Sequence, residues 1–199
     1  ALRARLRAEG RVEGKGPDLA QLLDLVAVGT VADLVPLDAN NRALVAAGLH
    51  RLRAGRACPG LMALVEVSGR RAGALVAADI GFAIGPRLNA AGRLEDMALG
   101  IECLLSDDPH QARELAEHLH RINAERRSVQ EAMVDDAEAA LAKLPSPAGE
   151  APLAVCLFDP DWHAGVVGLV ASKMKERLHR PVIAFAPAEP GSDQLRGSA

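Results

Sequence analysis

Apolar residues recur every three or four positions through much of the first half of the chain, a spacing that predicts helices burying one face. Residues 40–53 follow it clearly, and residues 61–67 and 97–105 are short apolar segments that we also expect to be helical. Residues 19–28 are aliphatic without a definite period, so they fit a helix or a strand equally well. The first half is therefore expected to be built mainly from helices.

A long helix is expected next. Asp108 can cap it, Pro109 suits its first position, and Gln111 completes a capping-box pattern. Apolar residues then continue at the same spacing, with Arg126 interrupting the stripe. The helix should end before residues 145–149 (PSPAG), because neither a helix nor a central strand tolerates such a run. We place a domain boundary there.

The last part of the chain reads strand, helix, strand. Residues 153–158 and 181–185 are apolar strand segments, residues 165–178 are helical, and a third strand starts near Leu195. This order favours a right-handed crossover between parallel strands. The expected fold class is α/β.

Composition fits that reading and narrows the function. Of 199 residues, 49% are hydrophobic and 2% are aromatic, so the core must be aliphatic and broad aromatic stacking on nucleic acid is disfavoured. The net charge of −3 means that a nucleic-acid function needs a local basic site. Three scattered cysteines and no apolar membrane span favour the cytoplasm. The first residue is not Met, and we expect a piece of a longer protein.

The first candidate for chemistry is Asp33, within residues 29–37 (GTVADLVPL), of which we expect residues 31–37 to form a short buried turn. A carboxylate among apolar residues must be paired, hydrogen-bonded or bound to a metal ion. The alternative is a helix cap or turn aspartate. Spacing alone does not decide, because hard divalent ions usually need several oxygen ligands.

Residues 85–93 (GPRLNAAGR) form the second candidate. Arg87 and Arg93 offer bidentate donors for phosphate, and Asn89 lies between them with a donor and an acceptor. If this stretch is one helix, the two arginines do not lie on one line, so we expect a bent loop leading into a helix. The alternative is a capped turn with solvated arginines.

Two further candidate segments lie next to predicted strands: one follows the first strand, and the other belongs to the third. His163 precedes a predicted helix, whose first turn favours an anion, although His163 could simply cap that helix. Gly197 and Ser198 are small residues that could contact a backbone phosphate. By contrast, we interpret His118 and His120 on the long helix as solvated surface residues.

Five segments, in order, resemble the RecJ branch of the DHH phosphoesterase family. The resemblance implies the C-terminal part of a DHH catalytic lobe (residues 1–105), a connecting long helix (106–145) and the N-terminal part of an α/β DHH-associated lobe (151–199). The segments are residues 29–37, 41–49 (NRALVAAGL), 84–93 (IGPRLNAAGR), 121–127 (RINAERR) and 162–185 (WHAGVVGLVASKMKERLHRPVIAF).

The resemblance also implies an activity: 5′→3′ hydrolysis of single-stranded DNA with two Mn²⁺ or Mg²⁺ ions, in DNA repair and recombination. It implies a RecQ-type helicase and a single-strand-binding protein as partners. Asp33 would be the catalytic metal ligand in this chain. The implied DNA-binding residues are Arg87, Asn89, Arg93, His163, Gly197 and Ser198.

The chain lacks most of the implied metal site. The family's aspartate and DHH motifs would lie before Ala1, and the arginine of its GSxRS motif would lie after Ala199. We therefore expect the chain alone to be inactive. The alternatives are a DHH phosphoesterase acting on short oligonucleotides or cyclic dinucleotides, and a non-catalytic DHH-like scaffold that binds single strands.

Overall fold

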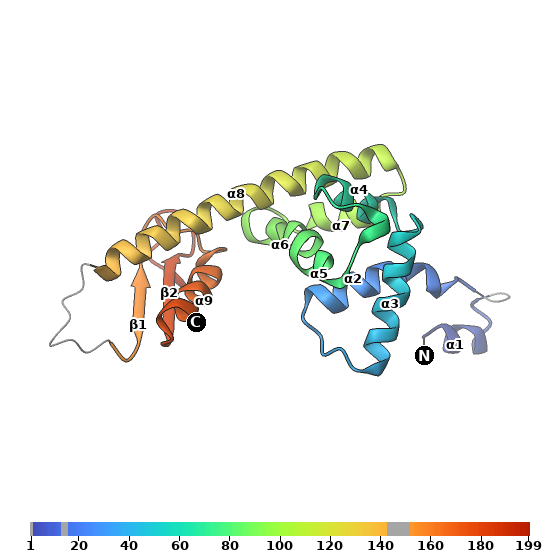
Figure 1. Cartoon of the computed structure of the whole chain (residues 1–199), viewed down its shortest axis with the longest axis horizontal. Helices are drawn as coiled ribbons and strands as arrows, with labels where there is room; N and C mark the ends of the chain where they lie inside the picture. Colours follow the sequence, from blue (N-terminus) through green and yellow to red (C-terminus); the bar gives the residue numbers. More distant parts are fainter. Residues whose placement is uncertain (1, 13–15, 143–151) are drawn as a thin grey trace. The chain divides into compact units, whose positions relative to one another are not determined.

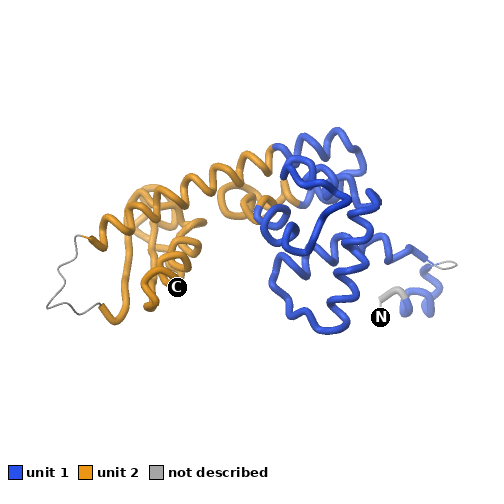
Figure 2. The backbone as a smooth tube through the Cα atoms, viewed as in Figure 1, with its two compact units in different colours: residues 1–86, 101–117 blue, residues 87–100, 118–199 orange. Residues whose placement is uncertain are grey.

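The computed structural model describes residues 2–12, 16–142 and 152–199. The chain divides into two compact units, residues 1–86 with 101–117 (unit 1) and residues 87–100 with 118–199 (unit 2) (Figure 2). These units differ from the ranges expected from the sequence because the long helix contributes to both, so the predicted domain ranges stay a prediction. Within the described ranges, none of the helices combines the length and the apolar character needed to span a membrane.

All regular elements among the described residues of unit 1 are helices, joined by turns and loops (Figure 1). Its core is aliphatic, with Leu52, Leu61, Leu64 and Ile80 fully buried. The short turns η1 and η2 are 3-10 helices, and η3 is a π-helix. Its complete elements are α1 (Leu2–Ala8), η1 (Leu19–Leu22), α2 (Leu23–Ala32), α3 (Ala39–Arg53), α4 (Pro59–Val67), η2 (Ala72–Ala74), α5 (Ala77–Asp79) and η3 (Ile80–Ile84).

Three more helices carry residues of both units: α6 (Gly85–Leu94), α7 (Ala98–Leu105) and α8 (Pro109–Ala142). The predicted start of the long helix is confirmed, because the Asp108 carboxylate accepts from the His110 N–H at 2.9 Å. The capping box is not formed as expected, since the Gln111 side-chain oxygen accepts from the Ser106 hydroxyl at 3.1 Å. The predicted boundary at residues 145–149 lies outside the described residues.

The expectation of a buried turn at residues 31–37 is wrong. Helix α2 runs to Ala32, and Leu34 then takes a left-handed conformation (φ 54) that turns the chain outward. Leu34 is 88% exposed, and Asp33 is exposed as well. Apolar sequence alone suggested burial here, but the turn runs along the surface of unit 1.

Unit 2 contains the α/β part that the sequence predicts. Its elements are β1 (Val155–Phe158), α9 (Val167–Leu178), β2 (Val182–Pro187) and β3 (Leu195–Ser198). Strands β1 and β2 are parallel, and β3 pairs antiparallel with β2, in the order β1-β2-β3. The predicted parallel crossover is confirmed.

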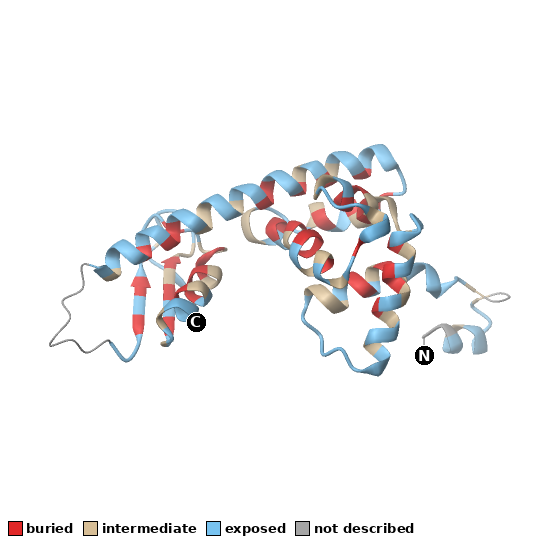
Figure 3. Cartoon of the chain, in the orientation of Figure 1, coloured by how far each residue is buried: buried red, intermediate tan, exposed pale blue. Residues whose placement is uncertain are grey.

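One face of this sheet is buried in the core of unit 2. The core joins inward-facing residues of β1 and β2 to Met133 and Val134 of α8 and to Val170 and Met174 of α9. Buried positions recur along α8 between exposed ones (Figure 3). The loop between β1 and α9 is anchored in the same core by Trp162, which is 6% exposed. This core fixes the loop against α8.

Candidate nucleic-acid interface

Asp33 is the C-cap residue of α2, with its own N–H bonded to the Gly29 carbonyl at 3.1 Å. Across the described residues, its carboxylate makes no hydrogen bond and no ion pair. The C-terminal end of a helix carries partial negative charge, so an unpaired carboxylate there is favoured only when a cation lies nearby. The exposed Asp33 carboxylate is therefore open to solvent or to a cation, and its role as a metal ligand stays a prediction.

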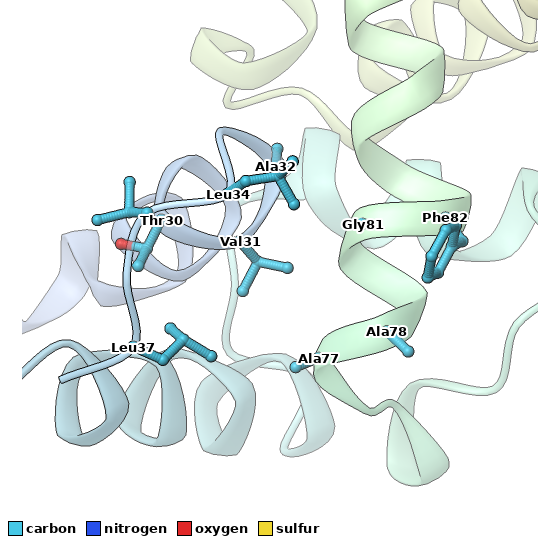
Figure 4. Close-up of a pocket in the computed structure, with 10 residues that line it drawn as sticks. Thr30, Val31, Ala32, Leu34, Leu37, Ala77, Ala78, Gly81 and Phe82 are labelled. Atoms are coloured by element: carbon cyan, nitrogen blue, oxygen red, sulfur yellow. The ribbon is translucent and has the colours of Figure 1, made fainter. Parts of the chain in front are cut away.

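The surroundings of Asp33 add no second ligand. Its neighbours Ala32 and Leu34 line an apolar cavity of about 480 Å³, together with residues of α5 and η3 such as Phe82 (Figure 4). No cluster of three or more histidine, cysteine or acidic side chains suited to a metal ion occurs in the parts of the chain that the structure describes. Asp33 fits one ligand position of a hard-metal site and no more.

The segment at residues 85–93 is helical, so the expectation of a bent loop is wrong. Helices α5, η3 and α6 follow one another without a break from residue 77 to residue 94. Pro86 does not interrupt them because it occupies the first turn of α6, where a backbone N–H has no helical partner to lose. As a consequence, Arg87 and Arg93 leave α6 on different sides.

Arg87 and Asn89 lie on the same helix but differ in exposure. Arg87 is 7% exposed, and its Nε and Nη2 lie 3.2 and 3.1 Å from Nδ1 of His120 on α8. Asn89 is exposed. His120 is exposed and His118 is partly exposed, as expected of surface residues, but both have partners, since His118 Nε2 lies 3.4 Å from a Glu95 carboxylate oxygen.

Arg93 meets the loop before α9. Its Nη1 donates to the Gly165 carbonyl at 3.2 Å. A Cβ at Gly165 would overlap the Arg93 carbonyl oxygen, so only glycine allows this approach. Two segments of the family pattern, 72 residues apart, thus lie in direct contact within unit 2.

His163 closes the turn at the start of the same loop. It is exposed, and its Nδ1 accepts from the Gly165 N–H at 3.1 Å. Helix α9 begins only at Val167, so His163 caps a turn and not the helix. With Nδ1 accepting, the proton of a neutral ring is on Nε2, which is then free to donate.

Gly197 and Ser198 lie on β3, over the first turn of α9. A Cβ at Gly168 would stand 3.0 Å from the Ser198 hydroxyl oxygen, so that hydroxyl faces the N-terminal turn of the helix. Gly197 lies against the ring of Phe185. A helix N-terminus with a hydroxyl beside it is a favourable place for an anion.

Sequence reasoning missed two residues of α8. Asn123 is 3% exposed, and its side-chain oxygen has no hydrogen-bond partner among the described residues. The same holds for the buried Nε of Arg126, one turn further on. Burial lowers the pKa of Arg126, and the positive charges of Arg127 and Arg93 lower it further. The interruption of the apolar stripe by Arg126 was the signal in the sequence.

Together, Arg93, Asn123, Arg126, His163 and Ser198 make up what we call the anion cluster of unit 2. Arg126 offers a buried N–H that lacks an acceptor, and the side chains of Arg93, His163 and Ser198 offer further donors near the N-terminus of α9. Leaving a buried donor unsatisfied costs roughly 1–3 kcal/mol, so an oxygen-rich anion would relieve that cost. Asp33 does not belong to this cluster, because it is a carboxylate, which would bind a cation, and because it lies in unit 1.

Comparison with known proteins gives one consistent result. No protein-family model matches the sequence. The chain is 55% identical over 201 aligned residues to "Single-stranded-DNA-specific exonuclease RecJ" of Dickeya dadantii, and 51% identical to the protein of the same name from Escherichia coli. Each alignment covers 100% of this chain and 34% of the relative, so the chain spans about a third of the length of these curated relatives.

Solved structures agree. The crystal structure of Thermus thermophilus RecJ in complex with Mn²⁺ matches with a TM-score of 0.76 and 38% identity, over 93% of this chain and 26% of that chain. The Mg²⁺ complex of the same protein matches with a TM-score of 0.75. Both the sequence and the arrangement of helices and strands are therefore similar to those of an internal segment of RecJ.

Proposed function

The chain corresponds along its whole length to a segment of the RecJ single-stranded-DNA-specific exonucleases, and on this premise we propose that it is part of a 5′→3′ exonuclease for single-stranded DNA. The enzyme hydrolyses phosphodiester bonds during DNA repair and recombination in the cytoplasm. The observation that carries the proposal is the anion cluster of unit 2, in which the buried Nε of Arg126 is a donor without a partner among the described residues.

The anion cluster binds backbone phosphates of the strand. Arg93 and His163 approach from α6 and from the loop before α9, and Ser198 lies at the first turn of that helix. Phosphate contacts carry no sequence information, so binding is sequence-independent and weakens steeply with salt. Asn89, exposed on α6, supplies an additional polar contact.

Asp33 binds one of two Mn²⁺ or Mg²⁺ ions of the whole enzyme. When bound, such a pair of ions stabilises the attacking and the leaving oxygen of a phosphodiester. Asp33 holds its carboxylate at the negative end of α2, where a cation is favoured. One carboxylate is too few for tight binding of a hard ion, so this chain alone is inactive.

The whole protein acts beside a RecQ-type helicase and a single-strand-binding protein. A helicase supplies the single strand that the enzyme degrades, and a binding protein keeps that strand open. This part of the proposal rests on the resemblance alone.

The test compares substrates. The whole protein, with Mn²⁺, receives equal amounts of a long single strand, its duplex and a dinucleotide. We expect preferential loss of the long single strand, and no cleavage by Asp33→Asn, which keeps the shape of the side chain but removes its charge. Asp136→Asn, on an exposed position of α8, is the matched control and should cleave normally.

Other outcomes select other functions. Preferential cleavage of the dinucleotide would make the protein a phosphoesterase for short substrates. Binding of the strand without cleavage would make it a scaffold. Full activity of Asp33→Asn would remove Asp33 from the metal site.

A further inference from the structure

The two arginines of α6 lie in different environments within unit 2. The guanidinium of Arg87 is buried against His120 of α8, with two N–H groups 3.2 and 3.1 Å from the same ring nitrogen. Arg93 is half-buried and donates to the Gly165 carbonyl instead. Arg93 follows Arg87 by six residues, which at 3.6 residues per turn places the two side chains roughly 120° apart around the helix.

The contact between Arg87 and His120 has defined chemistry. A guanidinium only donates hydrogen bonds, so Nδ1 of His120 must accept with its lone pair, and the ring is neutral with its proton on Nε2. His120 itself is exposed on α8. A buried cation must be hydrogen-bonded, and His120 supplies an acceptor from a helix that is separate from α6.

We propose that Arg87 and His120 form a latch that docks α6 on α8, so that Arg93 is held ready for a phosphate while Arg87 contacts none. His120 is thus a positioning residue that acts through Arg87. This inference rests on the proposed function for its link to DNA. The latch itself is a property of unit 2.

His118 provides an internal control. It is on the same helix, two residues earlier, and points toward Glu95 and not toward Arg87. Replacing it changes a neighbouring histidine without touching the latch.

Salt dependence separates a phosphate contact from a positioning contact. For single strands, each phosphate contact contributes about 0.7 to the slope of log affinity against log salt. The probe is a fluorescent, 5′-phosphorylated oligodeoxynucleotide, and the 199-residue chain is titrated by anisotropy at several salt concentrations. We expect Arg93→Gln to reduce the slope by about 0.7.

Arg87→Gln and His120→Leu should weaken binding by about tenfold to a hundredfold, the loss of one charge-assisted hydrogen bond, and leave the slope unchanged. His120→Gln keeps an acceptor and should recover most of the affinity. His118→Leu should bind like the unaltered chain. A slope reduced in Arg87→Gln as much as in Arg93→Gln would overturn the proposal.

Hydrogen exchange tests the latch without DNA. Amides of residues 85–94 should exchange faster in His120→Leu than in His118→Leu or the unaltered chain, because α6 opens more often. Unchanged exchange there would refute the latch even if binding fell. If the unaltered chain bound no oligonucleotide and the whole protein cleaved none, the proposed function would fail, and exchange would still decide whether the latch exists.

Discussion

Asp24 in unit 1 is a buried charged side chain and Arg126 in unit 2 is a partly buried one, but their hydrogen bonding differs. Asp24 is 1% exposed and accepts from the N–H groups of Leu25 at 2.8 Å and Cys58 at 2.9 Å. It ties the start of α4 to α2. Arg126 makes one 3.3 Å hydrogen bond to Gln130, and its buried Nε has no partner within the described residues.

This difference distinguishes a charged residue that stabilises the fold from one that can bind a ligand. A buried charge whose hydrogen bonds are all made inside the protein stabilises the fold and has little left to offer a ligand. A partly buried charge with an unused, buried donor, held near other positive charges, is unfavourable until an anion binds. Arg126, whose pKa is lowered by burial and by Arg127 and Arg93, is of the second kind.

Removing Asp24 should have the largest effect on stability. Asp24→Ala leaves the N–H groups of Leu25 and Cys58 without acceptors, so we expect unfolding free energy to fall by about 2–4 kcal/mol. Urea denaturation of the chain measures this. Asp38→Ala, which removes an exposed N-cap of α3, should cost only about 1 kcal/mol. Equal losses would mean that burial of Asp24 adds nothing.

Adding one methyl group should act oppositely in the two units. Gly165→Ala forces a Cβ against the Arg93 carbonyl in unit 2 and should destabilise by about 1–3 kcal/mol, with weaker binding of single strands. Gly29→Ala places a methyl group in open space on α2 and should stabilise by about 0.5–1 kcal/mol. Thermal unfolding followed by circular dichroism distinguishes the two. A neutral Gly165→Ala would show that the loop moves away from α6 freely.

Replacing Arg126 should sharpen the contrast with Asp24. Arg126→Met removes a partly buried cation with an unused donor, so we expect stability to be unchanged or to rise by up to about 1 kcal/mol. Affinity for a 5′-phosphorylated single strand should fall at the same time. Urea denaturation and anisotropy on the same samples test both. A clear loss of stability would make Arg126 an architectural residue like Asp24.

The smallest effect concerns the thiols. Burial, with a smaller contribution from Cys58, raises the pKa of Cys103 in unit 1 from 9.0 to about 11, whereas Cys156 in unit 2 is exposed. At pH 8 we expect iodoacetamide to alkylate Cys156 first and Cys103 only after unfolding, as read by mass spectrometry of peptides.

The same pKa fixes a pH effect on unit 1. The Cys103 thiol is protonated in both the folded and the unfolded chain below pH 9, so its full contribution to the free energy of unfolding is present there. Above that pH the unfolded chain loses the proton first, and the contribution is lost between pH 9 and about 11. Denaturation midpoints that rise in this range would contradict the assignment.

Much of the fold could be predicted from local pattern. The three-four spacing predicted α3 and α8, Asp108 marked the start of α8, and two apolar runs with a helix between them predicted the parallel pair of β1 and β2. These features depend on residues close together in the sequence, so a sequence can report them. The ordered segments also predicted the resemblance to RecJ, which the comparisons confirm.

The candidate site was only partly accessible in this way. The sequence pointed to Arg93, His163 and Ser198, and the roles assigned to them remain predictions. It pointed equally to Arg87 and Arg93, and it placed Asp33 in a buried turn. It passed over Asn123 and gave no sign that the exposed His120 contacts Arg87.

The sequence by itself therefore determined which elements form, in what order, and which family they resemble. Only the tertiary structure decided which polar groups are satisfied. Arg87 meets His120 across 33 residues, and Arg93 meets Gly165 across 72. Burial and hydrogen-bond partners depend on segments brought together by folding, and no periodicity along the chain reports what lies on the other side of a contact.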